Sequence, residues 1–569
     1  REGHADSACD RRVRTERVRA PLRVLGLRRR GARDRVVGDG KATQVVRLTS
    51  VQVYEPEGAL ARCIPEQMAD SGGSVPSVPS SSHVVVDNPY PQEWGHTASF
   101  ATRSDKIVCV LVGLPARGKS YIARRLAQYV SFFYSTPCKV FNVATYLQNL
   151  TGQDMHPASE EAEPHRVRAN EAALAHLCEW MEEAMKPKAK RRKADSESAS
   201  PTRTCDTGGP YVSGEFEFGA LAVYDGTNCT IERRSWVMEK LKPTGAKVIF
   251  IEISCDDDGA VLRNLLAERL AQGEPEPAEE EKRRILLDFT RRVAHYENTY
   301  EPVSEKDLSW IRVSRGSSNQ VTMHNIRGFL PSRIAQFLMN INLERQPFYF
   351  SRHGQSQYNQ LGKIGGDSDL TELGEEYATE LAKWVMTNVK VGQDGSPQPA
   401  RLWTSSLRRT IRTARHITHE KIILPNGTEW VQMRPKRWRN LDEIYAGLCD
   451  GMTYEEIATH FPQEAVARKA DKFEYRYPRG ESYSDLISRL EPMAHEMERM
   501  QQPLLVVAHQ AILRVLYCYL MEKPRESCPE AAIPLNTVIK LIPTAVGCKE
   551  ERFDVIPKRP GVELDPASH

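Results

Sequence analysis

Short apolar runs alternate with longer segments of helical periodicity along most of the chain. The run IVCVLVGL (107–114) precedes residues 121–133, whose apolar side chains recur at helical spacing. KVFNV (139–143), LAVYDGT (221–227) and KVIFIEI (247–253) are further runs of this kind. Apolar strands without polar alternation are typical of parallel sheets buried on both faces. Their alternation with helices predicts an α/β fold with a mainly parallel sheet.

A second series of strands follows with different motifs. FYFSRHG (348–354), ARLWTSS (400–406) and PLLVVAHQ (503–510) are expected strands, and 406–418 is an expected helix. We therefore expect two α/β domains with a boundary near residues 340–346. The expected divisions are a poorly ordered tail at 1–100, a first domain at 101–345 with a flexible insertion at 186–209, a second domain at 346–550, and a C-terminal tail at 551–569.

Charge is distributed unevenly along the chain. The formal net charge is +3, but residues 1–50 alone contain 14 Lys and Arg against six Asp and Glu. The rest of the chain is therefore slightly acidic, which disfavours nucleic acid as a partner. The basic tail is expected to be solvated or regulatory, and binding of nucleic acid or anionic lipid is the less favoured alternative.

Targeting signals and cysteine spacing suggest a compartment. No apolar stretch reaches the roughly 18 residues of a membrane span, and no secretory leader opens the sequence. The 12 cysteines form no CxxC pair with metal-ligand spacing. A reduced, cytoplasmic protein without membrane contact is the expectation.

Residues 113–120 carry the first chemical motif. They fit GxxxxGK[ST], between an expected strand and an expected helix. Gly113 and Gly118 would let backbone N–H groups converge on phosphate oxygens, Lys119 would reach the terminal phosphates, and Ser120 would bind Mg²⁺. A glycine turn without chemical meaning is the weaker alternative.

Asp225 ends the strand LAVYD. Beside a phosphate loop, a carboxylate there would bind Mg²⁺ or contact a substrate hydroxyl, although a strand-end Asp is elsewhere often a turn cap. Arg233 and Arg234 on the next helix could clamp an anionic acceptor, or they could form a solvated face.

The second motif is Arg352-His353-Gly354, directly after a strand. A second strand-end histidine, His509, and several cations with one acid follow it: Arg409, Glu443, Arg468 and Lys472. Arginine matches phosphate geometry, and positive neighbours keep a histidine neutral and nucleophilic. His353 could then accept a phosphoryl group while Glu443 protonates the leaving oxygen. Metal binding by the two histidines is disfavoured because the surrounding cations would repel it.

A phosphate loop followed by an RHG turn in one chain resembles the bifunctional 6-phosphofructo-2-kinase/fructose-2,6-bisphosphatase family. The resemblance covers about residues 105–550. It is carried by GLPARGKSYIARRL, DGTNCT, FIEISCDD, RHGQSQYN, KIGGDSDLTELG, RYPRGESYSDLI and AHQAILRVL, among which IGGDS and RYPRGESY are the most specific. It implies a P-loop kinase domain and a histidine-phosphatase domain of the phosphoglycerate-mutase type.

The resemblance also implies roles for individual residues. In the first half it makes Lys119, Asp225 and Cys255 catalytic and Asn264 an ATP contact. The implied sugar-phosphate contacts there are Arg168, Thr227, Arg233, Arg269, Arg292 and Tyr296. In the second half, His353 would become the phosphohistidine, Glu443 the proton donor, and Arg352, Asn359 and His509 transition-state contacts. The implied substrate contacts are Gly365, Arg409, Tyr454, Arg468, Lys472, Tyr483, Gln510 and Arg514.

Departures from the family pattern fall mainly in the first half. Where the family usually has Tyr-Arg-Arg, this chain has Tyr146-Leu147-Gln148, and Ile231 replaces another arginine. A lysine expected after Asn264 is Arg269. Loss of one arginine–phosphate contact costs about 1.5–3 kcal/mol of binding energy.

Three hypotheses follow. The first is a bifunctional enzyme that uses ATP and Mg²⁺ to make fructose 2,6-bisphosphate from fructose 6-phosphate and also hydrolyses it, which controls glycolytic flux. The second is a phosphatase-dominant member with a weakened kinase half, and the third is a non-catalytic ATP-sensing scaffold. The resemblance further suggests a homodimer, with regulatory protein kinases acting on the tail or the insertion.

Overall fold

The computed structural model describes residues 106–151, 163–184, 219–271, 277–316, 319–343, 346–392, 394–544 and 547–557. The predictions for the tail at 1–100 and for the insertion at 186–209 lie outside the described residues. So do the predictions for residues 558–569 of the C-terminal tail.

The first sheet has six strands in the order β2-β3-β1-β4-β5-β6, and its central pairs are parallel. Only the edge pair β5 and β6 runs antiparallel. The parallel order places the end of β3 directly beside the end of β1. The strands are β1 Lys106–Val112, β2 Cys138–Asn142, β3 Ala220–Asp225, β4 Lys247–Cys255, β5 Ser309–Arg315 and β6 Gln320–His324.

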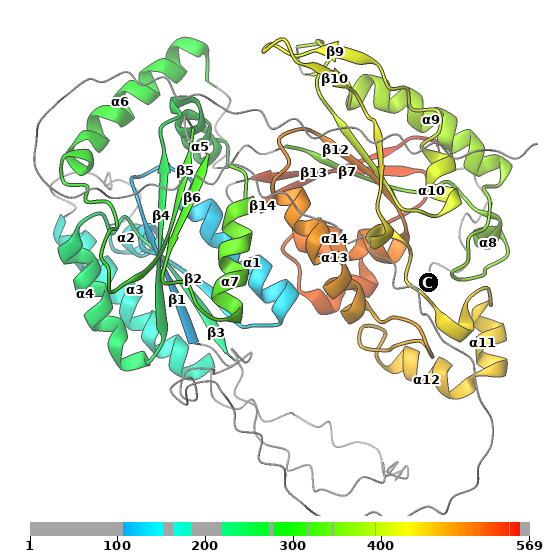
Figure 1. Ribbon diagram of the computed structural model, residues 1–569, viewed down its shortest axis with the longest axis horizontal. Helices are drawn as coiled ribbons and strands as arrows, with labels where there is room; N and C mark the ends of the chain where they lie inside the picture. Colours follow the sequence, from blue (N-terminus) through cyan, green and yellow to red (C-terminus); the bar gives the residue numbers. More distant parts are fainter. Residues whose placement is uncertain are drawn as a thin grey trace, which may run out of the picture. The chain divides into compact units, whose positions relative to one another are not determined.

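Helices cover both faces of this sheet, with α1 and α7 on one side and α3 and α4 on the other (Figure 1). Strand β1 shows why, because Ile107, Cys109 and Leu111 pack into one core while Val108 and Val110 pack into another. The helices are α1 Lys119–Tyr134, α2 Val143–Thr151, α3 Glu163–Ala184, α4 Ile231–Leu241, α5 Asp258–Ala271, α6 Glu279–Asn298 and α7 Phe329–Asn340.

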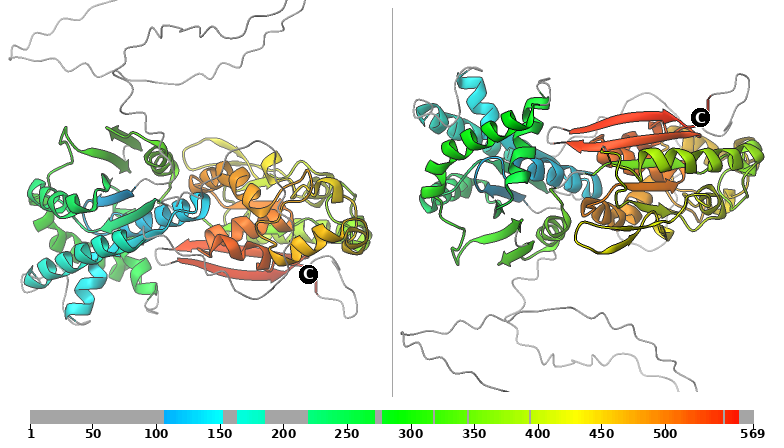
Figure 2. Two further views of the ribbon diagram at one scale, coloured as in Figure 1. Left: turned by 90° about the horizontal axis from the view of Figure 1, so that it is seen from below. Right: turned by 90° about the horizontal axis from the view of Figure 1, so that it is seen from above.

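The second sheet also has six strands, in the order β11-β8-β12-β7-β13-β14. Strands β7, β8, β11 and β12 pair in parallel, and β13 pairs antiparallel with both neighbours. Figure 2 shows β13 and β14 side by side in red. The strands of this sheet are β7 Phe348–Arg352, β8 Arg401–Thr404, β11 Pro435–Arg437, β12 Leu504–Ala508, β13 Thr537–Thr544 and β14 Gly547–Asp554, and a separate hairpin comprises β9 Lys421–Ile423 and β10 Glu429–Val431.

Helices again cover both faces of the second sheet. On β12, Leu504 and Val506 pack with α13 and α14, whereas Leu505 and Val507 pack with α9. The helices are α8 Gln357–Gln360, α9 Glu372–Asn388, α10 Arg408–Thr413, α11 Tyr454–His460, α12 Pro462–Ala470, α13 Tyr483–Glu498 and α14 Gln510–Leu520.

Two predicted boundaries differ from the structure. The helix expected at 406–418 is the shorter α10, because the backbone leaves the α-helical pattern after it. The N–H groups of Arg415 and Ile417 bond the carbonyls three residues earlier, at Arg412 and Ala414. Strand β14 continues to Asp554, so it extends into the stretch expected to be a C-terminal tail.

Helix α1 links the phosphate loop to the second half of the chain. Its Arg125 forms a buried ion pair with Glu498 of α13, and Tyr519 of α14 donates to the same carboxylate at 2.6 Å. A charged pair removed from water is costly to break on one side only. Helix α1, which begins at the phosphate loop, is therefore held against α13 and α14 by a buried polar contact in its second turn.

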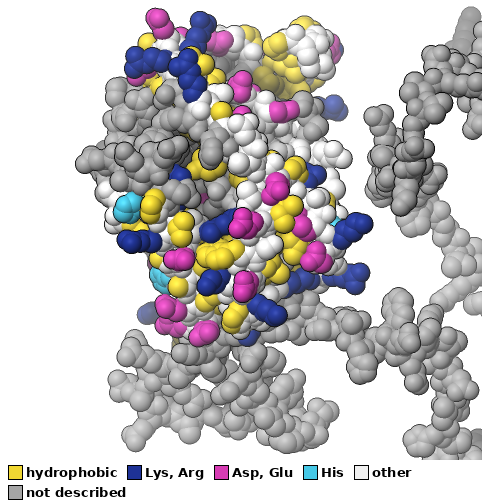
Figure 3. All heavy atoms as spheres, turned by 90° about the vertical axis from the view of Figure 1, so that its left-hand side faces the viewer, with side chains coloured by type: hydrophobic (Ala, Val, Ile, Leu, Met, Phe, Trp, Pro, Cys, Tyr) yellow, Lys and Arg dark blue, Asp and Glu magenta, His cyan; other side chains and the backbone are white. Residues whose placement is uncertain are grey.

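The described surface shows no single-sign patch on the face drawn in Figure 3. Lys and Arg side chains are interspersed there with Asp and Glu. Among the described residues, no helix is both long enough and apolar enough to cross a membrane.

Candidate active sites

The phosphate loop turns on two glycines in the left-handed region. Gly113 has φ 141°, and a Cβ there would lie 2.3 Å from the Ile253 carbonyl oxygen. Gly118 has φ 89° and is the N-cap of α1. Any side chain at Gly113 would clash with β4, so only glycine lets the loop begin this close to that strand.

Lys119, Ser120 and Asp225 meet where β1 and β3 end. Lys119 Nζ donates to the Leu114 carbonyl at 2.6 Å. Asn142 Nδ2 donates to Asp225 Oδ2 at 2.7 Å and to Ser120 Oγ at 3.4 Å. Burial raises the pKa of Asp225, while Lys119 and hydrogen bonds from Ser120 and Asn142 oppose that rise.

The hydroxyl of Ser120 and the carboxylate of Asp225 are hard oxygen ligands of the kind that Mg²⁺ prefers. They therefore fit a magnesium ion held mainly by substrate phosphates. Among the described residues, no group of three or more His, Cys, Asp or Glu could bind a metal by itself.

A cavity opens beside this loop. Of the predicted residues, Lys119, Ser120, Asp225, Thr227 and Tyr296 line it. Much of the remaining wall is apolar, with Val143, Ala144, Leu147, Leu265, Phe289 and Val293.

Other predicted residues of the first half lie elsewhere. Arg168 is exposed and Arg166 lines the cavity instead, because two residues on a helix are about 200° apart. Arg233 stacks 3.9 Å over the Trp236 ring and donates to the Tyr224 hydroxyl at 3.4 Å. Its neighbour Arg234 is fully buried and pairs with Glu305, so it is structural rather than a clamp for substrate.

Two predicted residues lie behind the loop. Asn264 donates to the Ala116 carbonyl at 2.9 Å and so supports the loop from α5. Cys255 lines a separate cavity with Asp256 and Arg315. The side chains of Arg269 in α5 and Arg292 in α6 lie outside the described part of the structure.

The two strand-end histidines of the second half come together because β7 and β12 are parallel neighbours. Arg352 and Ala508 are register partners, so His353 and His509 leave the sheet side by side. Their ring centroids are 5.1 Å apart, and the backbone N–H of His353 donates to the Ala508 carbonyl at 3.0 Å.

The His353 ring is oriented as a nucleophile. Its Nδ1 lies 2.7 Å from the Gly354 carbonyl, which can only accept, so the proton sits on Nδ1 and Nε2 keeps its lone pair. Burial, with Arg409 and Arg352 nearby, holds the pKa of His353 well below its usual range. The imidazole is therefore neutral at pH 7.

His509 is held by two contacts. Its Nδ1 accepts from Arg409 Nε at 3.2 Å, and its Nε2 then donates to Ser405 Oγ at 2.8 Å. Arg409 also donates to the Gly366 carbonyl at 2.6 Å. The second histidine thereby fixes the guanidinium beside the nucleophile.

A cavity opens over His353. Its wall contains most of the predicted residues of this half: Arg352, His353, Asn359, Gly365, Arg409, Glu443, Tyr454, Arg468, Lys472, Tyr483, Gln510 and Arg514. Glu443 is the one acid among the lining residues. Burial raises the pKa of Glu443, although Arg409 and Arg352 oppose the rise. A neutral histidine, five cations and one carboxyl whose pKa is raised by burial suit phosphoryl transfer from a polyanion.

Comparisons with known proteins match both halves of the chain. A family model described as 6-phosphofructo-2-kinase matches residues 96–186 and 214–345, and one described as the histidine phosphatase superfamily (branch 1) matches residues 348–554. A 6-phosphofructo-2-kinase/fructose-2,6-bisphosphatase of Aquarana catesbeiana is 37% identical over 465 residues, which cover 81% of this chain and 87% of that protein. The chain belongs to the 6-phosphofructo-2-kinase/fructose-2,6-bisphosphatase family.

A human relative and a solved phosphatase structure were also matched. The human 6-phosphofructo-2-kinase/fructose-2,6-bisphosphatase 1 is 35% identical over 449 residues, covering 78% of this chain and 83% of that protein. Among solved structures, the alpha-ribazole phosphatase of Shigella flexneri is 20% identical with a TM-score of 0.29, covering 34% of this chain and 90% of that one. The predicted family and the predicted two-domain α/β fold are confirmed.

The phosphatase cavity of this family member also holds residues that the sequence did not single out. Lys363 adds a sixth cation, and Tyr358, Tyr475 and Tyr477 add ring edges and hydroxyls. Lys363 opens the KIGGDS stretch and Tyr477 lies in RYPRGESY, so each sat inside a recognised motif. Their positions in these motifs could have identified them as candidate site residues.

Tyrosines orient one of the predicted arginines. Arg468 Nε donates to the Tyr477 hydroxyl at 2.9 Å, and its other end donates to the Tyr454 hydroxyl at 2.8 Å. The guanidinium also lies 4.4 Å above the Tyr454 ring. Nearby, burial and the charges of Arg468 and Arg514 lower the pKa of Lys472 to about 8.

Two turns of the phosphatase half depend on close contacts. Asn359 Oδ1 accepts from the Ser356 N–H at 3.0 Å and closes a capping box at α8. Gly365 has φ 69°, and a Cβ there would lie 1.8 Å from Asp450 Oδ1. Both contacts hold the segment that carries Lys363 against the cavity.

Proposed function

We propose that this chain transfers the γ-phosphoryl group of ATP to the 2-hydroxyl of fructose 6-phosphate at the phosphate loop. It hydrolyses the product, fructose 2,6-bisphosphate, at His353. The observation that carries the proposal is the cavity over His353, where a neutral imidazole faces several guanidiniums and a carboxyl whose pKa is raised by burial. Assays of both activities on one preparation test it, and absence of both would contradict it.

Hydrolysis proceeds in two displacements. His353 Nε2 bonds to the 2-phosphorus while the bond from phosphorus to the sugar oxygen breaks, and Glu443 gives its proton to that oxygen. Arg352 and Arg409 neutralise the charge on the transferring group. In the second displacement, the Glu443 carboxylate takes a proton from water as the water oxygen bonds to phosphorus, and His353 is released.

Synthesis depends on positioning and charge rather than on a covalent intermediate. Lys119 lies where it can bind the transferring phosphoryl group, and Asp225 can accept the proton of the sugar hydroxyl. Thr227 lines the same cavity and can orient the sugar. A magnesium ion held by Ser120 and Asp225 would neutralise phosphate charge.

A second candidate function is that of a phosphatase-dominant family member, in which hydrolysis of fructose 2,6-bisphosphate is faster than its synthesis. Leu147 takes the place of a family arginine, is buried, and lines the cavity beside the phosphate loop. Of the described side chains that line this cavity, the cations are Lys119 and Arg166. An apolar wall at that point lacks a partner for a sugar phosphate, so binding of fructose 6-phosphate is expected to be weak.

Leu147→Arg is expected to restore that contact. A new charge-assisted bond should lower the KM for fructose 6-phosphate about tenfold or more in the ATP-dependent assay. The matched control is Leu150→Arg, on the same helix α2 but exposed to solvent. An unchanged KM in the folded Leu147→Arg protein would remove the case for a weakened kinase half.

The phosphatase half is expected to lose affinity in base. Lys472, with a pKa of about 8, is a cation below that pH and is neutral above it. The KM for fructose 2,6-bisphosphate should therefore stay level below about pH 7. It should rise between about pH 8 and pH 9, by up to about tenfold per pH unit. Lys472→Arg should flatten this rise, and a level wild-type profile would show that Lys472 does not bind the substrate.

Three broader properties are proposed from the family resemblance. The chain is proposed to act in the cytoplasm, to form a homodimer, and to be modified by protein kinases on its tail or on the 186–209 insertion. Light scattering of the full chain tests the dimer, and a monomer at assay concentrations would contradict it.

A further inference from the structure

The proton donor Glu443 lies in an irregular segment. Residues 438–450 contain only two short 3-10 turns, at Arg439–Leu441 and Gly447–Cys449. The Glu443 carboxylate accepts from its neighbouring Ile444 N–H at 2.9 Å, a contact that moves with the segment, and the Ala511 N–H of α14 also bonds it. General acid catalysis needs its carboxyl within hydrogen-bond reach of the leaving oxygen. The backbone of this segment must therefore be fixed by something outside it.

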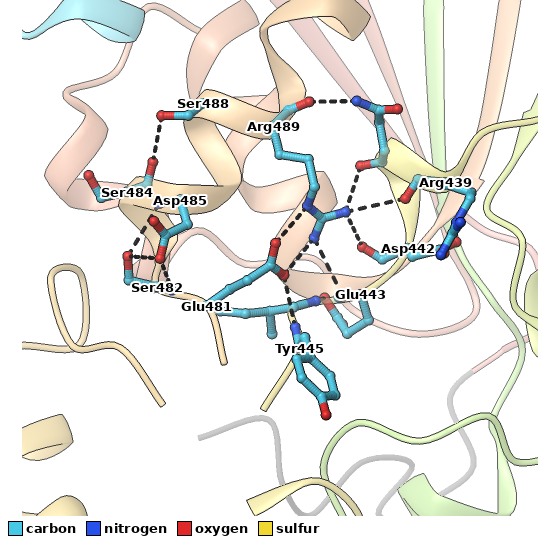
Figure 4. A network of polar contacts seen from close by, with 12 residues as sticks. Arg439, Asp442, Glu443, Tyr445, Glu481, Ser482, Ser484, Asp485, Ser488 and Arg489 are labelled. Atoms are coloured by element: carbon cyan, nitrogen blue, oxygen red, sulfur yellow. Dashed lines mark hydrogen bonds and ion pairs between the residues drawn. The ribbon is translucent and has the colours of Figure 1, made fainter. Parts of the chain in front are cut away.

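Arg489 of α13 makes the contacts that fix one side. Its guanidinium donates to the carbonyls of Asn440 and Asp442, each at 2.9 Å (Figure 4). Longer contacts reach the carbonyls of Arg439 at 3.4 Å and Glu443 at 3.5 Å. One side chain on a regular helix thus bonds the backbone immediately before the proton donor.

Glu481 extends the same contact to the other side. It pairs with Arg489 through both carboxylate oxygens, each at 2.9 Å. Its Oε2 accepts the Tyr445 N–H at 3.0 Å, and its own N–H donates to the Tyr445 carbonyl at 2.9 Å. Figure 4 shows Arg489 and Glu481 together spanning the backbone on either side of Glu443.

At Gly447 and Gly480 the backbone packs too closely against a neighbouring segment to leave room for a side chain. A Cβ on Gly480 would lie 2.4 Å from the Tyr445 carbonyl oxygen, and one on Gly447 would lie 2.0 Å from the Pro478 carbonyl oxygen. The segments around residues 445 and 480 therefore lie backbone against backbone. A shift of the Arg489 anchor would be passed to Glu443 rather than absorbed.

We propose that Arg489 is a positioning residue for the proton donor Glu443 and that Glu481 acts with it. The inference rests on the proposed hydrolysis at His353. Arg489 lines an adjoining cavity with Glu443 and does not line the cavity over His353, so it acts through the loop rather than by touching the substrate. Its planar fork pairs with both Glu481 oxygens while its remaining nitrogen bonds the carbonyls of Asn440 and Asp442, a combined geometry that a lysine cannot reproduce.

Substrates with different leaving groups separate positioning from simple stabilisation. The leaving group of fructose 2,6-bisphosphate is a sugar alkoxide, which needs the proton of Glu443. The leaving group of p-nitrophenyl phosphate is a phenolate, which is stable without a proton. Arg489→Met should lower kcat for the bisphosphate about 10- to 100-fold, as expected for a displaced catalytic group. The KM for the bisphosphate and the rate with p-nitrophenyl phosphate should each change less than about threefold.

Two further variants complete the comparison. Arg489→Lys should fall between wild type and Arg489→Met, because it keeps a donor but not the fork. The matched control is Arg476→Met, which removes an exposed arginine that pairs with Asp485 at 2.8 Å and does not contact the Glu443 segment. It should leave both substrates at wild-type rates.

A double-mutant cycle decides the route. In a Glu443→Gln background, Arg489→Met should add less than about threefold, since the group it positions has already gone. Equal loss with both substrates, or full additivity with Glu443→Gln, would overturn the proposal and leave Arg489 a structural residue. Failure of the wild-type chain to hydrolyse fructose 2,6-bisphosphate would instead overturn the proposed function itself.

Discussion

His353→Ala is expected to lower hydrolysis of fructose 2,6-bisphosphate by about 10³-fold or more and to leave ATP-dependent synthesis at the wild-type rate. The reason is that the proposed mechanism has the imidazole form the covalent bond to phosphorus, and His353 is the one histidine in the described wall of this cavity. The measurement is release of labelled phosphate from fructose 2,6-bisphosphate labelled at position 2.

The control for this variant is His419→Ala. His419 is exposed and lies outside the lining of the cavity over His353. It should hydrolyse the substrate normally. Hydrolysis that persists in His353→Ala, with the same KM as wild type, would mean that the phosphoryl group never passes through this residue.

Lys119→Met is expected to lower synthesis about 10²- to 10³-fold and to leave hydrolysis unchanged. The side chain is buried at the start of α1, and its ammonium group is one of the two cations that line the described cavity beside the phosphate loop. Methionine keeps the length of the side chain but removes the charge that stabilises the transferring group. The measurement is ATP-dependent formation of fructose 2,6-bisphosphate.

Lys242→Met is the control for the kinase half. Lys242 is exposed at the C-terminal end of α4, where no contact with the phosphate loop exists among the described residues. It should synthesise the product at the wild-type rate. Substantial synthesis by Lys119→Met would place the phosphoryl-transfer site elsewhere.

The two candidate sites were predictable because their residues follow buried strands. Asp225, His353 and His509 each end an apolar run, and parallel strands deliver such ends to one edge of a sheet. The sequence could not say that β7 and β12 are neighbours. That pairing, with Arg352 opposite Ala508, is what brings the histidines together.

The direction of each side chain was harder to predict from the sequence. Arg168 and Arg166 are equally plausible in a linear sequence, and only the phase of α3 selects Arg166 for the cavity. Arg233 is equally suited to a phosphate or to an aromatic ring, and the structure places it over Trp236. These choices depend on packing between elements rather than on local pattern.

Contacts to backbone carbonyls were beyond the sequence altogether. Arg489 carries no motif signal, since its partners are carbonyls of Asn440 and Asp442 rather than particular side chains. The same holds for the link between Asn264 and the Ala116 carbonyl behind the phosphate loop. Such anchors become visible only when the fold fixes which loop passes which helix.

A single labelling experiment tests the central claim that one chain makes and breaks the same phosphate ester at two separate sites. The full chain is incubated with fructose 6-phosphate and ATP labelled in the γ-phosphoryl group, and the label is followed with time. It should appear first in fructose 2,6-bisphosphate, then on His353, and finally as free phosphate. In His353→Ala the label should stop in fructose 2,6-bisphosphate. Label that reaches free phosphate without passing through either species would contradict the account.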